Sequence, residues 1–93
     1  MRRHLIRSEA FVRTARRLLK KHPDAAETLR TTLVLLAEDA FHQILKTHKL
    51  KGELAGSWSC SAGYDLRIVF EFVQHDGVEA ILLQAIGTHD EVY

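Results

Sequence analysis

The chain has little of the chemistry that builds disulfides, metal sites or membrane spans. Cys60 is the only cysteine among the 93 residues, so no intrachain disulfide can form and no paired-cysteine zinc motif exists. Nothing near it in the sequence would activate this thiol as a nucleophile. No apolar run reaches membrane-spanning length, and the start of the chain lacks the apolar stretch of a signal peptide. We therefore expect a cytoplasmic protein with no membrane association, no metal and no other cofactor.

The charges are nearly balanced overall but unevenly distributed. A hydrophobic content of 46% and a charged content of 27% predict one folded domain over residues 1–93 rather than a disordered chain. Eight basic residues lie within residues 1–21, where Glu9 is the only acid, and Lys46, Lys49 and Lys51 form a second basic group. Such clustering on a chain of net charge +1 suits a nucleic acid or an acidic peptide as partner, although a plainly solvated surface explains it equally well.

Apolar periodicity predicts two helices in the first half of the chain. A short strand at residues 4–6 precedes Ser8, which is placed to cap a helix that ends near His22. Pro23 then interrupts the pattern, and a second run of apolar residues at helical spacing follows it. Propensity alone would extend this second helix to about Leu45.

The second half predicts an antiparallel meander. Strands are expected at residues 57–61, 64–73 and 78–86, with a tight hairpin at Asp76-Gly77. Two helices followed by such a sheet predict an α+β fold in which the helices pack on one sheet face. In the middle strand apolar and polar side chains alternate. If the apolar positions face the helices, Asp65 and Arg67 lie together on the uncovered face.

Three motifs cover residues 48–93. The first runs from His48 to Trp58 and reads HKLKGELAGSW, the second runs from Ser59 to Phe70 and ends in DLRIVF, and the third is GTHDEVY at residues 87–93. In this order and at this spacing they resemble the RelE/ParE superfamily of type II toxin–antitoxin toxins, and most closely its RelE/StbE and YafQ-like branch.

The resemblance implies a fold, an activity and partners. The fold would have two N-terminal helices on a small, mostly antiparallel sheet of about four strands. It also implies that the second helix ends near Ala37 or Glu38, with residues 39–56 irregular. The activity would be endonucleolytic cleavage of messenger RNA in the ribosomal A site, without a metal, in the bacterial cytoplasm. The expected partners are ribosomal RNA and a cognate antitoxin that neutralises the toxin in a hetero-oligomer.

The resemblance also implies which residues form the site. By position in the motifs, the catalytic set comprises His48, Asp65, Arg67, His89 and Tyr93. A set of possible RNA contacts comprises Lys49, Lys51, Trp58, Ser61 and Tyr64. We take as a hypothesis that His89 is the general acid or base, that His48 is the second proton-transfer group, and that Arg67 holds the scissile phosphate. Asp65 would orient a histidine, and Tyr93 would stack on a base or share in proton transfer.

Several alternatives stay open at this point. Ser61 stands where some relatives carry a histidine or an arginine. Either His48 and His89 suffice for cleavage, or this protein is a weaker nuclease than those relatives. Trp58 and Tyr64 could simply pack at the edge of the core, and Arg67 could pair with Asp65 or Glu71. A zinc site formed by His48, His89, Asp90 and Cys60 lacks the usual short ligand spacing. The same scaffold also hosts non-enzymatic ParE-like toxins that bind DNA gyrase, and a decayed toxin would bind only its antitoxin.

Overall fold

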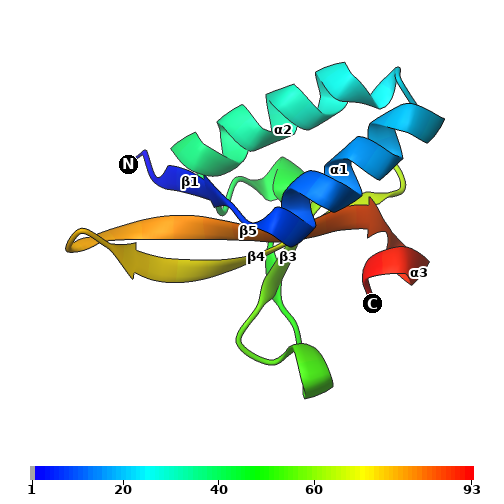
Figure 1. Ribbon diagram of the computed structural model, residues 1–93. Coiled ribbons are helices and arrows are strands. Elements are labelled where there is room, and N and C mark those ends of the chain that lie inside the picture. The colour runs from blue at the N-terminus through cyan, green and yellow to red at the C-terminus, as the bar shows by residue number, and fades with distance from the viewer. Residues whose placement is uncertain (1) are drawn as a thin grey trace.

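Five strands form one sheet, and the two long helices lie on one side of it (Figure 1). The computed structural model describes residues 2–93. The strand order is β1-β5-β4-β3-β2; β1 pairs with β5 in parallel and the other three pairs are antiparallel. The strands are β1 (His4–Arg7), β2 (His48–Lys49), β3 (Trp58–Ala62), β4 (Leu66–His75) and β5 (Val78–Thr88). The predicted α+β class is confirmed, with one strand more than expected because the two-residue β2 lies in the segment expected to be irregular.

The two long helices cover one face of the sheet. They are α1 (Glu9–Lys21) and α2 (Ala25–Glu38). The Ser8 hydroxyl accepts a hydrogen bond from the Phe11 N–H at 3.0 Å, which confirms Ser8 as the cap of α1. The second helix ends at Glu38, as the resemblance implied and earlier than propensity predicted. The chain turns there because Ala40 and Leu45 enter the core, and both are buried.

The chain between α2 and β3 contains two single 3-10 turns, η1 (Gln43–Leu45) and η2 (Gly52–Leu54). A last helical turn, α3 (His89–Val92), follows β5. No helix among residues 2–93 is long and apolar enough to cross a membrane.

The predicted hairpin is present between β4 and β5. Asp76 and Gly77 have φ angles of 53° and 82°, the two left-handed residues that a type I′ turn requires. The preceding turn corrects one prediction, because β4 begins at Leu66 and not at Tyr64. Asp65 therefore lies in the β3–β4 turn, where it is exposed to solvent, and is not a strand neighbour of Arg67.

The two faces of the sheet differ sharply in composition. Ile68 and Phe70 of β4 are fully buried beneath the helices, with Leu66 and Phe72 packed against the same cluster, as the alternation predicted. Cross-strand pairs place Cys60 beside Ile68 and Trp58 beside Phe70 on this helix face. We call the opposite side, which α1 and α2 leave uncovered, the open face. It carries the polar positions of β3 and β4.

Candidate functional site

Pairing of the strands gathers polar side chains on the open face at one end of the sheet. His48 of β2 pairs with Ser59 of β3, so their side chains project to the same side. Ser61 pairs with Arg67 of β4, and Arg67 pairs with Gly87 of β5. The open face therefore brings together four side chains from three strands, and those of His48 and Arg67 are among the predicted catalytic groups.

Arg67 occupies a position with little side-chain bulk on either side. Its cross-strand neighbours are Ser61 and Gly87, a small hydroxyl and no side chain at all. The guanidinium donates through Nη1 to the Leu66 carbonyl oxygen at 3.0 Å, which fixes one of its five donors. Among residues 2–93 no ion pair joins Arg67 to Asp65 or Glu71. The remaining donors can therefore hold a phosphate.

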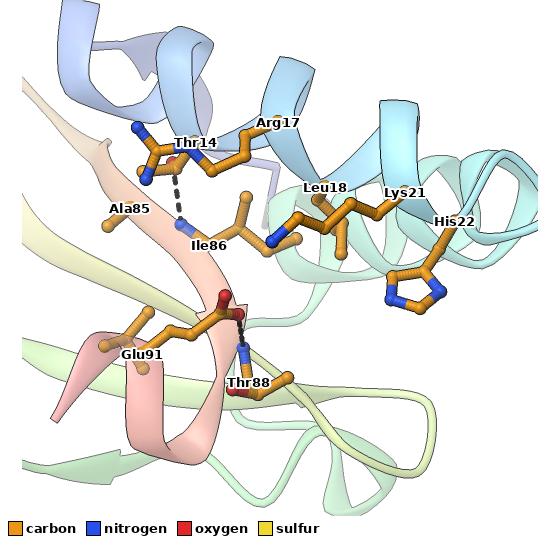
Figure 2. Close-up of a pocket in the computed structure, with 10 residues that line it drawn as sticks. Thr14, Arg17, Leu18, Lys21, His22, Ala85, Ile86, Thr88 and Glu91 are labelled. Atoms are coloured by element: carbon orange, nitrogen blue, oxygen red, sulfur yellow. Dashed lines mark hydrogen bonds between the residues drawn. The ribbon is translucent and has the colours of Figure 1, made fainter.

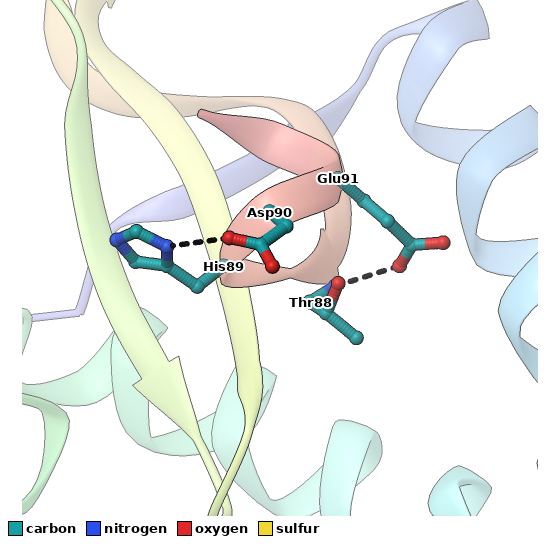
Figure 3. Close-up of polar contacts among 4 residues, drawn as sticks. All are labelled: Thr88, His89, Asp90 and Glu91. Carbon is teal, nitrogen blue, oxygen red and sulfur yellow. Dashed lines mark hydrogen bonds and ion pairs between the residues drawn. The ribbon is translucent and has the colours of Figure 1, made fainter.

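A capped helical turn carries the terminal motif (Figure 3). Thr88 is the N-cap of α3, and the Glu91 carboxylate accepts a hydrogen bond from the Thr88 N–H at 2.8 Å, which completes a capping box. This hydrogen bond, with help from the Thr88 hydroxyl and the cations of Lys21 and Arg17, holds the pKa of the Glu91 carboxyl below its usual value. The turn is only four residues long, so the box supplies much of what fixes its direction.

The last residue ties α3 to the open face. The Tyr93 hydroxyl donates to the Ser59 hydroxyl, and Ser59 has no exposed surface. The His89 ring meets the Tyr93 ring edge-on, with centroids 4.6 Å apart. A groove of about 420 Å³ lies beside Tyr93 and is lined by Leu50, Lys51, Glu53, Leu54 and Val92 as well. The predicted residues Lys51 and Tyr93 thus line one groove, and His89 packs against Tyr93.

The two predicted histidines have different partners. His48 contacts its own loop, with Nδ1 3.0 Å from the Lys46 carbonyl oxygen. His89 Nδ1 lies 3.4 Å from a carboxylate oxygen of Asp90, which favours a proton on Nδ1 and leaves the Nε2 lone pair as an acceptor. Asp90, and not Asp65, therefore lies against the terminal histidine. The pair is exposed and the contact is long, so its energy is small.

Three of the predicted RNA contacts lie elsewhere. Trp58 points to the helix face, where it packs edge-on against Phe72 with ring centroids 5.2 Å apart. Lys49 lies on the same helix face, because its Nζ is 5.5 Å from the centroid of the Trp58 ring. Neighbouring residues of a strand point to opposite sides, so His48 is on the open face and Lys49 is not. Tyr64 does not pack at the core edge: it is 99% exposed in the β3–β4 turn.

Cys60 lies on the helix face inside the apolar core. Burial raises the pKa of its thiol to about 12, which keeps it protonated and unreactive at neutral pH. The sheet itself separates this sulfur from His48 and His89, and no group of three potential metal ligands occurs among residues 2–93. The zinc arrangement considered from the sequence is therefore not assembled.

A second cavity separates α1 from the terminal turn (Figure 2). It measures about 190 Å³ and lies along the part of β5 that extends beyond β1. The Thr14 hydroxyl of α1 accepts from the Ile86 N–H at 3.1 Å, which satisfies a backbone donor on this edge. Arg17 and Lys21 form one wall of the cavity and Glu91 another.

The catalytic and RNA-contact sets expected from the sequence left out four residues that shape the site. Ser59 could have been found from alternation alone, because it lies between the inward-facing Trp58 and Cys60. Asp90 and Glu91 are adjacent to the predicted histidine, and the Thr-x-x-Glu pattern is a capping-box signal. Gly87 leaves room for the folded-back turn, since a Cβ there would lie 3.0 Å from Glu91 Oε1.

The fold is shared by solved toxin structures. Escherichia coli YafQ from strain BL21(DE3) superposes with a TM-score of 0.79 at 18% identity, covering 98% of each chain. A YoeB/ParE toxin from Agrobacterium tumefaciens gives a TM-score of 0.74 at 16% identity, covering 92% of this chain and 98% of that one. A mutant toxin from Helicobacter pylori gives 0.75 at 22% identity over the whole of both chains. A search of curated protein sequences gives no match.

A family model identifies the chain more specifically than the fold does. The model described as the bacterial toxin of type II toxin–antitoxin systems, YafQ, matches residues 3–93. The chain therefore belongs to the YafQ family of type II toxin–antitoxin toxins, as the three motifs indicated.

Proposed function

We propose that this toxin is a ribosome-dependent endoribonuclease that cuts messenger RNA at the open face. The observation that carries the proposal is the convergence of His48, Arg67, His89 and Tyr93 on one end of that face. Imidazoles can exchange protons near neutral pH, and a guanidinium matches the geometry of a phosphate. A gyrase-binding toxin has no use for such acid–base groups.

The proposed reaction needs only these side chains and the RNA. The 2′-oxygen of the nucleotide attacks the adjacent phosphorus, the bond from phosphorus to the 5′-oxygen breaks, and a 2′,3′-cyclic phosphate and a 5′-hydroxyl result. One group must take the 2′-hydroxyl proton and another must protonate the leaving 5′-oxygen. DNA is spared because it lacks the 2′-hydroxyl.

Each side chain has a proposed role that follows from its contacts. His89, with Asp90 at Nδ1, presents Nε2 as the proton-transfer atom, and His48 on β2 serves as the second such group. Arg67 stabilises the charge that grows on the phosphate oxygens. Tyr93 lines the site beside His89 and can stack on a base or share in proton transfer. A role for Asp65 stays a prediction, because no hydrogen bond or ion pair joins it to either histidine among residues 2–93.

The proposed partners follow from the family and from the charge. Escherichia coli YafQ has been solved in a complex with the antitoxin DinJ, and we propose that a cognate antitoxin likewise binds this chain in a hetero-oligomer. The RNA substrate would lie in the ribosomal A site of a bacterial cytoplasm. Lys51, in the groove that Tyr93 also lines, would hold RNA phosphates, and Ser61 beside Arg67 would contact the backbone. The basic α1 residues could meet ribosomal RNA.

The decisive test compares His89→Ala with His75→Ala on translating ribosomes. His75 is an exposed histidine at the β4–β5 hairpin, far along the strand from the site. Removal of a general acid or base lowers rates by about 10²–10⁴-fold. We expect that loss for His89→Ala and unchanged cleavage for His75→Ala, measured by primer extension of the messenger. Equal cleavage by both variants would rule out the proposed role of His89.

A parallel supercoiling assay with DNA gyrase separates the two toxin classes. The wild-type chain should leave supercoiling unchanged while it cuts transcripts. Inhibited supercoiling with intact transcripts would identify a ParE-like toxin, and neither effect would identify a decayed toxin that binds only its antitoxin.

A further inference from the structure

A chain of three polar side chains crosses the open face next to the proposed cleavage site. The Ser57 hydroxyl donates to the Gln84 side-chain oxygen at 2.9 Å, and the Gln84 amide nitrogen donates to the Glu71 carboxylate at 3.0 Å. These residues come from the residue just before β3, from β5 and from β4. All three are half-buried, so they are held in place and still reach solvent.

Strand alternation from the buried Leu83 turns Gln84 to this face, and a β-bulge leaves it without a partner on β4. Val69 pairs with Ala85 and the next residue, Phe70, pairs with Leu83, so Gln84 is an extra residue without a partner on β4. Leu83 and Ile86 both lie in the core, which leaves Gln84 and Ala85 to point away from it. Bulges often re-aim a side chain beside an active site. Here the unpaired residue is an amide that lies between a hydroxyl and a carboxylate.

The three side chains lie farther along the strands than the proposed catalytic groups, with Glu71 about 13 Å from Arg67 along β4. Ser57 is two residues from Ser59, which bonds Tyr93, and Glu71 is two residues from Val69, the strand partner of Ser59. Two residues of a strand span about 6.6 Å. The helices α1 and α2 lie on the other face of the sheet (Figure 1). An RNA strand that runs along β4 from a phosphate at Arg67 would reach Ser57, Gln84 and Glu71 within about two nucleotides.

We propose that Ser57, Gln84 and Glu71 form a nucleobase-reading site for a nucleotide that flanks the scissile phosphate. The site would take a base with an exocyclic amino group, which is adenine, cytosine or guanine. This inference rests on the proposed nuclease function and adds to it a specificity that the catalytic residues do not provide.

The hydrogen-bonding capacity of the three side chains sets this preference. The Gln84 amide is oriented by both neighbours, so its oxygen faces the Ser57 hydroxyl and its nitrogen faces Glu71. Glu71 keeps one carboxylate oxygen that no hydrogen bond occupies among residues 2–93. A carboxylate only accepts, and it pairs well with an amino group on the Watson–Crick edge of a base. Uracil presents carbonyl oxygens on both sides of its single N–H, so it would place oxygen against oxygen.

The test measures base preference instead of total cleavage. Stalled ribosomes are supplied with messengers whose A-site codon and its neighbours are randomised, and the cut ends are sequenced. The wild-type chain should cut at least about 10-fold less where one flanking position is uracil, which is the discrimination that one good base contact provides. Glu71→Gln, which can donate to a uracil oxygen, should reduce that difference to about 2-fold or less.

Two further variants complete the design. Gln84→Ala removes the amide that holds the Glu71 carboxylate and should also weaken the discrimination against uracil. Glu38→Gln makes the same chemical change as Glu71→Gln at an exposed residue at the end of α2, and should keep the wild-type preference. Thermal unfolding of each variant shows whether it is folded. If Glu71→Gln does not fold, the base preference of Gln84→Ala tests the proposed site in its place.

The outcomes separate this inference from the function on which it rests. A wild-type chain that cuts with no bias against uracil, or folded Glu71 and Gln84 variants with an unchanged bias, would overturn the base-reading site while the nuclease stands. A wild-type chain that cuts no messenger at all would overturn both.

Discussion

The Tyr93 hydroxyl donates a hydrogen bond to the hydroxyl of Ser59, a β3 residue that is entirely buried. The two residues are 34 positions apart, and this bond joins α3 to the open face of the sheet. Because α3 has no buried residue of its own, its position depends on a few polar contacts of this kind. The terminal site is therefore a lightly held part of the molecule.

Loss of this bond should loosen α3 with little effect on the rest of the fold. A typical hydrogen bond contributes about 0.5–1.5 kcal/mol to stability. We expect Tyr93→Phe, which keeps the ring against His89, to speed amide exchange in α3 by about 2- to 10-fold, the equivalent of that energy. Exchange in β4 should stay unchanged. Hydrogen exchange followed by NMR checks both, and equal protection of α3 in the two proteins would show that the bond does not hold the turn.

Gly87 should tolerate no side chain without displacing α3. A Cβ at this position would lie 3.0 Å from Glu91 Oε1 and 3.1 Å from Glu91 Cβ. Overpacking of this kind costs about 1–3 kcal/mol, or the turn must move away. We expect Gly87→Ala to abolish cleavage, measured by primer extension of the messenger, because His89 is carried by the turn that moves.

A matched substitution controls for stability. Gly77 has φ +82° in the hairpin, and a Cβ added there would meet no atom within 4 Å, so Gly77→Ala strains only the backbone. It should lower the unfolding temperature yet leave cleavage intact. If both alanine variants cleave normally, the close packing of Gly87 is not needed for activity.

Acid should release the terminal turn through Glu91. The Glu91 carboxyl has a lowered pKa in the folded chain, chiefly because the Thr88 N–H donates to it, so its ionised form favours the folded turn. The contribution is complete above the ordinary glutamate pKa of about 4.3 and is lost as the pH falls through the lower folded value. NMR shifts of α3 amides should therefore change below about pH 4. Glu91→Gln should remove that pH dependence.

Much of the fold follows from patterns that the sequence displays openly. Alternation in β4 and the Asp76-Gly77 turn define the hairpin, and Ser8 with its apolar stripe defines α1. β2 could not be predicted, because a two-residue strand has no periodicity to read. Without that strand, nothing assigns His48 to the open face and Lys49 to the helix face.

The site was predictable where a motif carries it and not where tertiary contacts build it. The terminal motif pointed to His89 and Tyr93, but the partner of Tyr93 lies 34 residues away on β3. The bulge at Gln84 leaves no mark in the sequence. Its neighbours Leu83 and Ala85 are both apolar, so either register would look plausible from the sequence. Contacts between strands depend on the register of the whole sheet, so the local pattern of the sequence cannot predict them.

Cys60 should behave as a core side chain and not as a reactive thiol. Its pKa is raised to about 12 by burial, so less than about one molecule in a thousand carries the thiolate at pH 8. We expect no alkylation by iodoacetamide at about that pH in the native protein and rapid alkylation in denaturant. Mass spectrometry of both samples measures this, and labelling of the native chain at the rate of a free thiol would contradict the burial.

Removal of residues 88–93 should separate folding from cleavage. The core cluster ends at Ile86 on β5, and α3 contributes no buried residue, so the apolar interior is left complete. The shortened chain loses the Thr88–Leu66 pair at the end of the sheet and exposes the Ser59 hydroxyl to water, which can replace the Tyr93 phenol as its partner. We expect a cooperative unfolding transition a few degrees below that of the full chain and no messenger cleavage. A shortened chain that still cuts would place the proton-transfer groups outside the terminal motif, with His48 the remaining histidine on the open face.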